Sequence, residues 1–169
     1  MKSRGGGDDE SDEITSERRE MIRGVQELSE TTVKEVMVPR VDTVFLSADA
    51  PRDEVLSTAV SCGHSRIPVY RDSIDDVIGV LYVKDLLHAM VKGGDFDVAS
   101  IIRKPFFVPD SKRIDSLLRE FKRRHVHIAI AIDEYGGVSG IVCMEDIIEE
   151  IVGEIQDEFD NERDDVVNL

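Results

Sequence analysis

The sequence is poor in aromatic residues and has no excess of positive charge. Only 5% of its 169 residues are aromatic and none is tryptophan, so it lacks the stacking surface that single-stranded nucleic acids need. The formal net charge of −15 at pH 7 also opposes contact with a phosphate backbone. Both features predict that nucleic acid is not a partner.

Cysteine and long apolar runs are scarce as well. Cys62 and Cys143 are the only cysteines, and neither lies in a CxxC motif or a Cys/His cluster. A zinc site or a disulfide framework is therefore not expected, and a reducing compartment is favoured. No run approaches the roughly 20 apolar residues of a membrane span, and no signal peptide precedes the first charges. We expect a soluble domain on the cytoplasmic side, a location compatible with attachment to a membrane protein.

The acidic charge is concentrated at the two ends of the chain. Residues 1–20 hold seven acids and four bases, and residues 150–169 hold eight acids and one base. We expect residues 1–16 to form a disordered acidic tail and residues 157–169 to form an acidic linker or tail. Residues 17–32 place four apolar side chains at helical spacing: Met21, Ile22, Val25 and Leu28. This pattern predicts a helix that docks on the rest of the molecule.

The middle of the chain is an internal repeat. "HSRIPVYRDSIDDVIGVLYVKDLL" (64–87) aligns without a gap on "HVHIAIAIDEYGGVSGIVCMEDII" (125–148), with an offset of 61 residues. Upstream, "VKEVM" (33–37) aligns on "VASII" (98–102) with an offset of 65, so the second copy is shorter near its start. The sequence predicts two tandem modules, module 1 (33–92) and module 2 (93–156).

Each module has the pattern β-α-β-β-α. The expected strands are short apolar stretches, and the expected helices have apolar residues at helical spacing. The strands are expected at 43–46, 66–70 and 77–83 in module 1, and at 106–109, 127–132 and 138–144 in module 2. One such module is too small to bury both faces of its sheet. We therefore expect an α+β fold in which the two modules pack through their sheets with pseudo-twofold symmetry.

The candidate site lies where the third strand of each module meets its last helix. In both copies an aspartate follows a strand glycine by six residues, as Gly79…Asp85 and Gly140…Asp146. A carboxylate at a helix start can accept two hydroxyl hydrogen bonds, as a ribose 2′,3′-diol offers them. Its simpler role is helix capping, which contributes about 1 kcal/mol. Repetition of the aspartate in both copies favours a ligand role.

Five motifs resemble those of known proteins: "ELSETTVKEVMVPRVD" (27–42), "GHSRIPVY" (63–70), "VLYVKDLL" (80–87), "AIAIDEYGGVSGIV" (129–142) and "EDIIEEIVGEIQDEFD" (145–160). Together they resemble a tandem of CBS domains, the Bateman module. More narrowly, they resemble the HlyC/CorC group of magnesium and cobalt efflux proteins, some of which are called hemolysins.

The resemblance implies a non-catalytic regulatory domain that senses adenine nucleotides. Its ligand would be ATP or AMP, with Mg²⁺ accompanying the nucleotide, in the cleft between the modules. Its partners would be a second copy in a homodimer and, in a longer chain, a membrane transport domain or a C-terminal CorC/HlyC-type domain.

The resemblance also assigns roles to single residues. Asp146 would hold the ribose of the principal site, and Asp85 that of the pseudo-equivalent site. Three residues before the second aspartate the family usually has threonine, but this chain has Cys143 there and Tyr82 at the matching place in module 1. Because a thiol is a poor hydrogen-bond donor, one ribose contact should be weakened.

Four residues in or beside the second strands are assigned in the same way. Ser65 and Arg66 would face the polyphosphate, although a strand-edge cap and a solvated arginine are simpler roles for them. Pro68 and Ile128 would help to wall the adenine, although both also suit an ordinary core.

Two other functions fit the sequence less well. A small metal-dependent hydrolase could use His64, Ser65, His125, His127 and Asp133, but the GxSxG, P-loop, GxGxxG and HExxH motifs are absent. A membrane-active hemolysin would need a helix with a Lys/Arg-rich polar face and a bulky apolar face, and no such segment is present. We expect neither catalysis nor a metal site formed by the protein alone.

Overall fold

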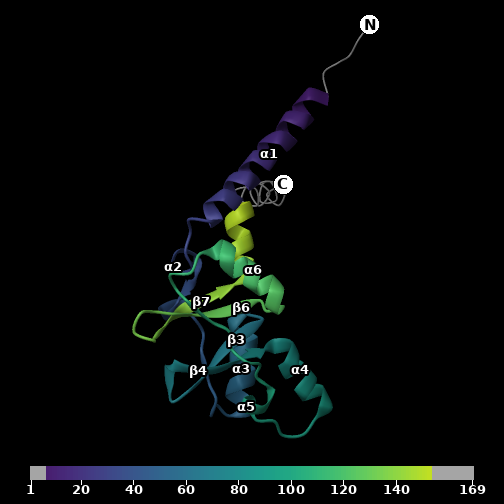
Figure 1. The fold of residues 1–169 in the computed structure, drawn as a ribbon. Coiled ribbons are helices and arrows are strands. Elements are labelled where there is room, and N and C mark those ends of the chain that lie inside the picture. Colours follow the sequence, from purple (N-terminus) through teal and green to yellow (C-terminus); the bar gives the residue numbers. More distant parts are fainter. Residues whose placement is uncertain (1–6, 154–169) are drawn as a thin grey trace.

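The computed structural model describes residues 7–153 and shows an α+β fold with two sheets (Figure 1). In chain order the elements are α1 (Gly7–Leu28), α2 (Val33–Val36), β1 (Val38–Pro39), the 3-10 turn η1 (Arg40–Asp42), β2 (Leu46–Ser47), α3 (Arg52–Cys62), β3 (Arg66–Arg71), β4 (Ser73–Tyr82), α4 (Val83–Lys92), α5 (Val98–Ile101), β5 (Phe107–Pro109), α6 (Ile114–Arg124), β6 (Ile128–Ile132) and β7 (Val138–Cys143). Residues 144–153 are helical and are called the last described helix.

Each module contributes one sheet, and the order β-α-β-β-α is confirmed in both. In module 1, β2 runs parallel to β3, and β3 runs antiparallel to β4. In module 2, β5 runs parallel to β6, and β6 runs antiparallel to β7. The sheet of module 2 has a fourth strand, β1, which comes from module 1 and pairs antiparallel with β7.

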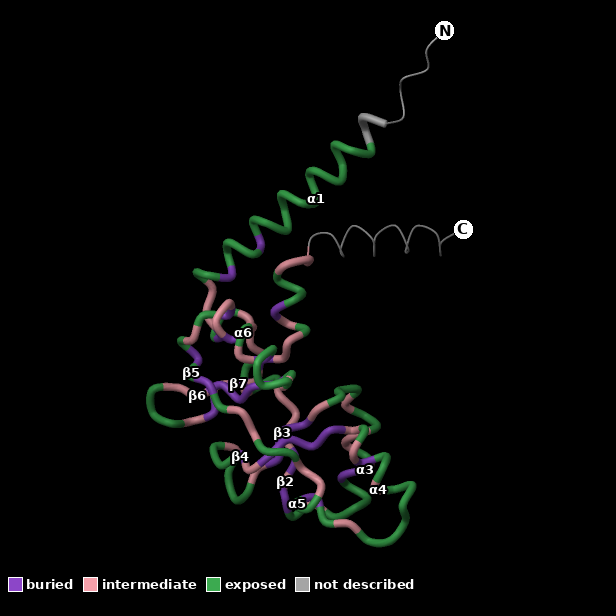
Figure 2. The backbone as a smooth tube through the Cα atoms, turned by 45° about the vertical axis from the view of Figure 1, so that its right-hand side comes forward, coloured by how far each residue is buried: buried purple, intermediate pink, exposed green. Residues whose placement is uncertain are grey.

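The two sheets pack face to face, because their strands are apolar on both sides. Along β6, Ala129 and Ala131 lie in a cluster with the helix residues Phe121 and Ile147. The alternate residues point the other way and form an inter-sheet cluster with residues of β4 and β7: Val77, Val80, Tyr82, Ile128, Ile130 and Val138. Figure 2 shows this burial concentrated on the strands.

The start of each module crosses onto the other module. Val38 pairs with Ile141 of β7, and at the repeat-related position Arg103 pairs with Val80 of β4 through two backbone hydrogen bonds of 2.9 Å. We call residues 33–39 and 98–104 the entry segments. As a result, Val33 is buried in the core of module 2 and Val98 in the core of module 1. The exchange is reciprocal, as pseudo-twofold symmetry requires.

The strand glycines are explained by this crossing. A Cβ atom on Gly140 would lie 2.3 Å from the carbonyl oxygen of Val38, and one on Gly79 would lie 2.9 Å from that of Arg103. Both distances are shorter than real Cβ contacts allow. The repeated glycine of the sequence therefore marks the place where the backbone of the other module passes over the strand.

The N-terminal segment differs from the prediction. Residues 7–16, expected to be disordered, are helical and belong to α1, whereas residues 1–6 and 157–169 lie outside the described residues. Helix formation is favoured there because acids such as Glu10, Asp12 and Glu13 suit the positive N-terminal end of the helix dipole.

The expected docking of this helix is confined to its C-terminal turns. Leu28 is buried, and Gly24 lies against the backbone of Ile151. Three of the four apolar residues of the predicted face remain exposed, by 40% for Met21, 58% for Ile22 and 55% for Val25. The reason is geometric: α1 projects beyond module 2, so that its upper turns have no neighbour in the described chain (Figure 1).

We expect Gly140→Ala to destabilise the protein by about 1–3 kcal/mol, because the added methyl group meets backbone atoms that cannot rotate away. Gly153→Ala is the matched control, since a Cβ atom there has no neighbour within 4 Å among the described residues. Residue 153 is helical, so this control should be neutral or slightly stabilising. Thermal and urea melts measure both changes. Equal stability of the Gly140→Ala and native proteins would contradict the crossing.

Candidate functional site

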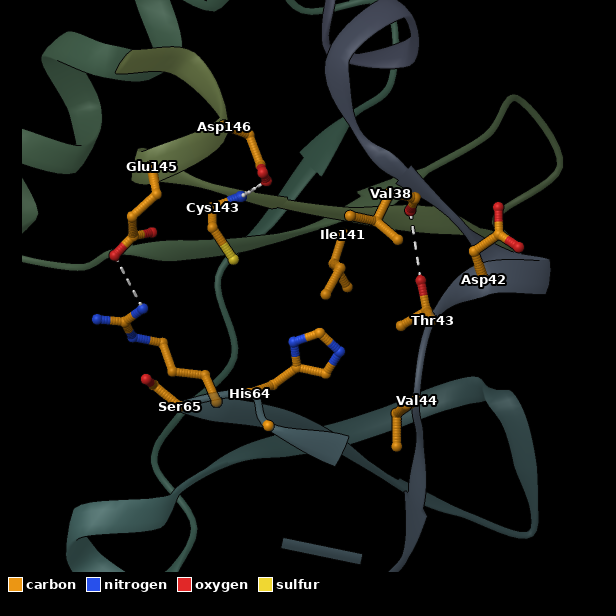
Figure 3. A pocket seen from close by; sticks show the side chains of 12 residues that line it. Val38, Asp42, Thr43, Val44, His64, Ser65, Ile141, Cys143, Glu145 and Asp146 are labelled. Carbon is orange, nitrogen blue, oxygen red and sulfur yellow. Dashed lines mark hydrogen bonds and ion pairs between the residues drawn. The ribbon is translucent and has the colours of Figure 1, made fainter. Parts of the chain in front are cut away.

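A cavity of about 350 Å³ opens between the two modules (Figure 3). Module 1 contributes the residues around η1 and the loop before β3, and module 2 contributes the end of β7 and the start of the last described helix. The lining residues are Val38, Asp42, Thr43, Val44, Gly63, His64, Ser65, Arg66, Ile141, Cys143, Glu145 and Asp146. We call this cavity the cleft.

Asp146 lies in the first turn of the last described helix and faces the cleft. Its Oδ2 accepts a hydrogen bond of 2.8 Å from the backbone N–H of Cys143, which is one half of a capping box. Among the described residues no donor is recorded for Oδ1. Burial raises the pKa of this carboxyl, the Cys143 N–H lowers it, and the charges of Glu145 and Glu149 raise it further. One oxygen therefore caps the helix while the other can meet a ligand.

Cys143 ends β7 and points into the cleft (Figure 3). Burial raises the pKa of its thiol to about 12, and the carboxylates of Asp146 and Glu145 add to the effect, while Arg66 opposes it. The side chain therefore stays a neutral thiol at physiological pH. It presents a weak donor and a weak acceptor beside Asp146.

Arg66, at the start of β3, connects the two modules across the cleft. Its Nη1 donates to Glu145 at 3.2 Å, and its guanidinium carbon lies 5.6 Å from the centroid of the Tyr82 ring. Its Nε is buried without a hydrogen-bond partner among the described residues. Ser65 precedes it and also lines the cleft. The cleft thus contains one guanidinium that is held by a carboxylate and an aromatic ring.

The electrostatic balance of the cleft is acidic. Asp42, Glu145 and Asp146 contribute carboxylates, and Arg66 is the one lysine or arginine among the lining residues. Within residues 7–153, no group of three or more His, Cys, Asp or Glu side chains is arranged to hold a metal ion. A ligand with several negative charges would therefore need a counter-ion that it brings with it.

Four of the eight predicted site residues line the cleft: Ser65, Arg66, Cys143 and Asp146. Pro68 and Ile128 do not, because both are buried within strands: Pro68 pairs with Val80, and Ile128 packs in the inter-sheet cluster.

Tyr82 and Asp85 also lie away from the cleft. Tyr82 is buried in the inter-sheet cluster, where its ring lies between the sheets. Both carboxylate oxygens of Asp85 accept hydrogen bonds from Arg103, at 2.7 and 3.0 Å. Asp85 and Asp146 thus lie at matching helix starts, as expected, but their carboxylates have different partners.

The other lining residues are not among the predicted site residues: Val38, Asp42, Thr43, Val44, Gly63, His64, Ile141 and Glu145. One signal could have found part of this set. The offset between the copies changes from 65 to 61 residues, so module 1 has four extra residues between its entry segment and β2. In the structure η1 occupies this region, and Asp42 at its end reaches the cleft.

The family model for the CBS domain matches residues 33–92 and 97–153. The chain therefore belongs to the CBS-domain family, in which it forms a tandem pair.

Its relatives confirm the narrower resemblance to the HlyC/CorC group. The chain is 46% identical over 153 residues to Hemolysin C of Brachyspira hyodysenteriae, a match that covers 90% of this chain and 56% of that protein. It is 43% identical over 164 residues to the magnesium and cobalt efflux protein CorC of Pasteurella multocida, covering 96% and 54%. The chain thus spans about half the length of these two relatives.

Solved structures agree with both the fold and the group. The CBS domain of a bacterial CNNM/CorC family Mg²⁺ transporter in complex with ATP has a TM-score of 0.75 and 45% identity, covering 80% of this chain and 97% of that one. A CBS-domain pair with bound AMP from Klebsiella pneumoniae has a TM-score of 0.66 and 31% identity, covering 72% and 98%. In the described part of this chain no helix has the length and apolarity of a membrane span.

The buried thiol gives a direct test of the cleft. At pH 8 a thiol whose pKa is about 12 is ionised in roughly one molecule in ten thousand, so Cys143 should react slowly with a disulfide reagent. We expect the Cys62→Ser variant to label roughly 100-fold or more slowly when folded than in denaturant. The Cys143→Ser variant reports the half-exposed Cys62 as the control. Equal rates in the folded and denatured Cys62→Ser protein would rule out a protonated Cys143.

Proposed function

We propose that this chain is a regulatory module that binds adenine nucleotide in the cleft and does not turn it over. The supporting observation is the cleft itself, in which Asp146 and Arg66 come from different modules and face one space. A relative of known structure with 45% identity is a complex with ATP, and another with 31% identity holds AMP. The sequence also lacks the GxSxG, P-loop, GxGxxG and HExxH motifs that would favour an enzyme.

The cleft residues have the chemistry that a nucleotide requires. Oδ1 of Asp146 would accept hydrogen bonds from the ribose hydroxyls, while Oδ2 continues to cap the helix. Arg66 would exchange its contact with Glu145 for a phosphate oxygen, a charge-assisted hydrogen bond of the stronger kind. Ser65 lies beside it as a further donor.

ATP would enter this acidic cleft together with Mg²⁺. The carboxylates of Asp42, Glu145 and Asp146 would repel a bare triphosphate. The described protein supplies no carboxylate cage of its own, so the metal would be held mainly by phosphate oxygens. AMP carries less charge and would depend less on Mg²⁺.

Regulation would follow from the position of the cleft between two modules. A ligand that contacts both modules favours the arrangement in which both contacts are made, and this shifts a conformational equilibrium. We propose that a transport region in a longer chain, on the cytoplasmic side of a membrane, responds to that shift. The module would act as a homodimer, and apolar side chains on the outer faces of α3 and α4, such as Val60 and Val91, are exposed to receive a second copy.

The first test is Asp146→Ala. We expect it to abolish ATP binding in isothermal titration with Mg²⁺, and we expect native protein to bind ATP much more weakly once EDTA removes the metal. Glu150→Ala is the matched control, because Glu150 is an exposed acid on the same helix. Because Asp146 also caps its helix, a thermal melt checks that the Asp146→Ala variant stays folded without this cap, which contributes about 1 kcal/mol. ATP hydrolysis that Asp146→Ala abolishes would overturn the non-catalytic proposal.

The second test concerns Cys143. Threonine has a similar volume and brings the hydroxyl that the family resemblance implies at this position. If the hydroxyl reaches the ribose, a net hydrogen bond of about 0.5–1.5 kcal/mol should raise the affinity for ATP about two- to tenfold. Two control variants distinguish the effect of the hydroxyl from that of the methyl group: Cys143→Ser supplies a hydroxyl without the methyl group, and Cys143→Val supplies methyl groups without a hydroxyl. Unchanged affinity with a lower melting temperature would remove residue 143 from the ligand contacts.

A further inference from the structure

The repeat relates the cleft to a second position on the other side of the molecule. An offset of 61 residues places Asp85 at the position of Asp146 and Tyr82 at that of Cys143. The offset of 65 in the entry segments places Arg103 at the position of Val38, and the backbone pairing of Arg103 with Val80 confirms this alignment. The two positions therefore share a backbone framework but differ in side chains.

At the second position the carboxylate of Asp85 is already paired with an arginine of the same chain. Arg103 donates from Nε to Oδ2 of Asp85 at 2.7 Å and from Nη2 to Oδ1 at 3.0 Å. This is a bidentate pair, which uses the carboxylate edge that two ribose hydroxyls would need. The guanidinium carbon also lies 4.2 Å from the centroid of the Tyr82 ring, so the arginine is stacked as well as paired.

At the first position, by contrast, no side chain of the described residues pairs with the free oxygen of Asp146. Val38 has no polar group that could reach Asp146, and Oδ1 of Asp146 has no recorded donor among the described residues. Cys143 is much smaller than the Tyr82 ring and leaves space in front of the aspartate. The four additional residues of module 1 lie in the region that forms the turn η1. Module 2 has no such turn between α5 and β5.

We infer that Arg103 occupies a second nucleoside position and keeps it closed, so that each chain binds one nucleotide, at Asp146. This inference rests on the proposed function and defines its stoichiometry. It also predicts that removal of the Arg103 side chain exposes Asp85 to the ribose of an adenine nucleotide.

The test counts AMP molecules bound per chain by isothermal titration. AMP is the probe because it carries the ribose without the full charge of a triphosphate. We expect one site in the native protein, none in Asp146→Ala, two in Arg103→Val and one in the double variant Asp146→Ala/Arg103→Val. Arg103→Val places at position 103 the residue that the protein itself uses at position 38. Arg103→Lys is the control that keeps a charge near Asp85, and it should remain at one site.

The Arg103→Val protein is expected to fold. The crossing uses only the backbone atoms of Arg103, and the ion pair with Asp85 is partly exposed, by 48% for the Arg103 side chain and 25% for that of Asp85, so it contributes little to stability. A melt checks this, and Asp85→Asn, in which the bidentate pair is lost but the arginine remains, should melt like Arg103→Val while it stays at one site.

The outcomes separate the two proposals. Two sites in native protein, or a single site in folded Arg103→Val, would overturn the closure by Arg103 and leave the function at Asp146 intact. No binding by native protein together with one site in Arg103→Val would support the closure and reject Asp146 as the site. No binding by any variant would reject both.

Discussion

The reciprocal crossing of the two entry segments is the constraint on which the rest of the structure depends. The backbone of Val38 pairs with β7, and the backbone of Arg103 pairs with β4. Because each module completes the other, neither can close its core alone: Val33 is buried in module 2 and Val98 in module 1. The crossing also brings the chain of module 1 over the end of β7, which forms one wall of the cleft.

The same crossing makes the two halves chemically different. Equivalent backbone positions carry a small apolar residue, Val38, on one side and a long cation, Arg103, on the other. Beside them stand two aspartates in equivalent places at helix starts, but Asp146 faces a cavity and Asp85 is paired with Arg103. A duplicated framework with unlike side chains thus places a cavity beside one aspartate and an ion pair at the other.

The polar side chains of the cleft make contacts within the protein that a ligand could replace or add to. Arg66 pairs with Glu145 from the other module, and Asp146 caps its helix through Cys143. The pKa of the Asp146 carboxyl is raised by burial, which indicates that its negative charge lacks full compensation in the protein alone. A polar ligand accompanied by a cation would supply that compensation and join the two modules.

The sequence by itself determined the repeat, the order β-α-β-β-α and the strand glycines, because periodicity and offset are local properties of the chain. It also singled out Asp146 and Arg66, which both line the cleft, since both lie at junctions where a strand begins or ends. Only the tertiary structure decided that Ile128 points into the inter-sheet cluster, because a strand that is apolar on both faces does not show which face meets the cleft. It alone paired Asp85 with Arg103, 18 residues further along the chain, since that contact requires the entry segment of module 2 to cross onto module 1.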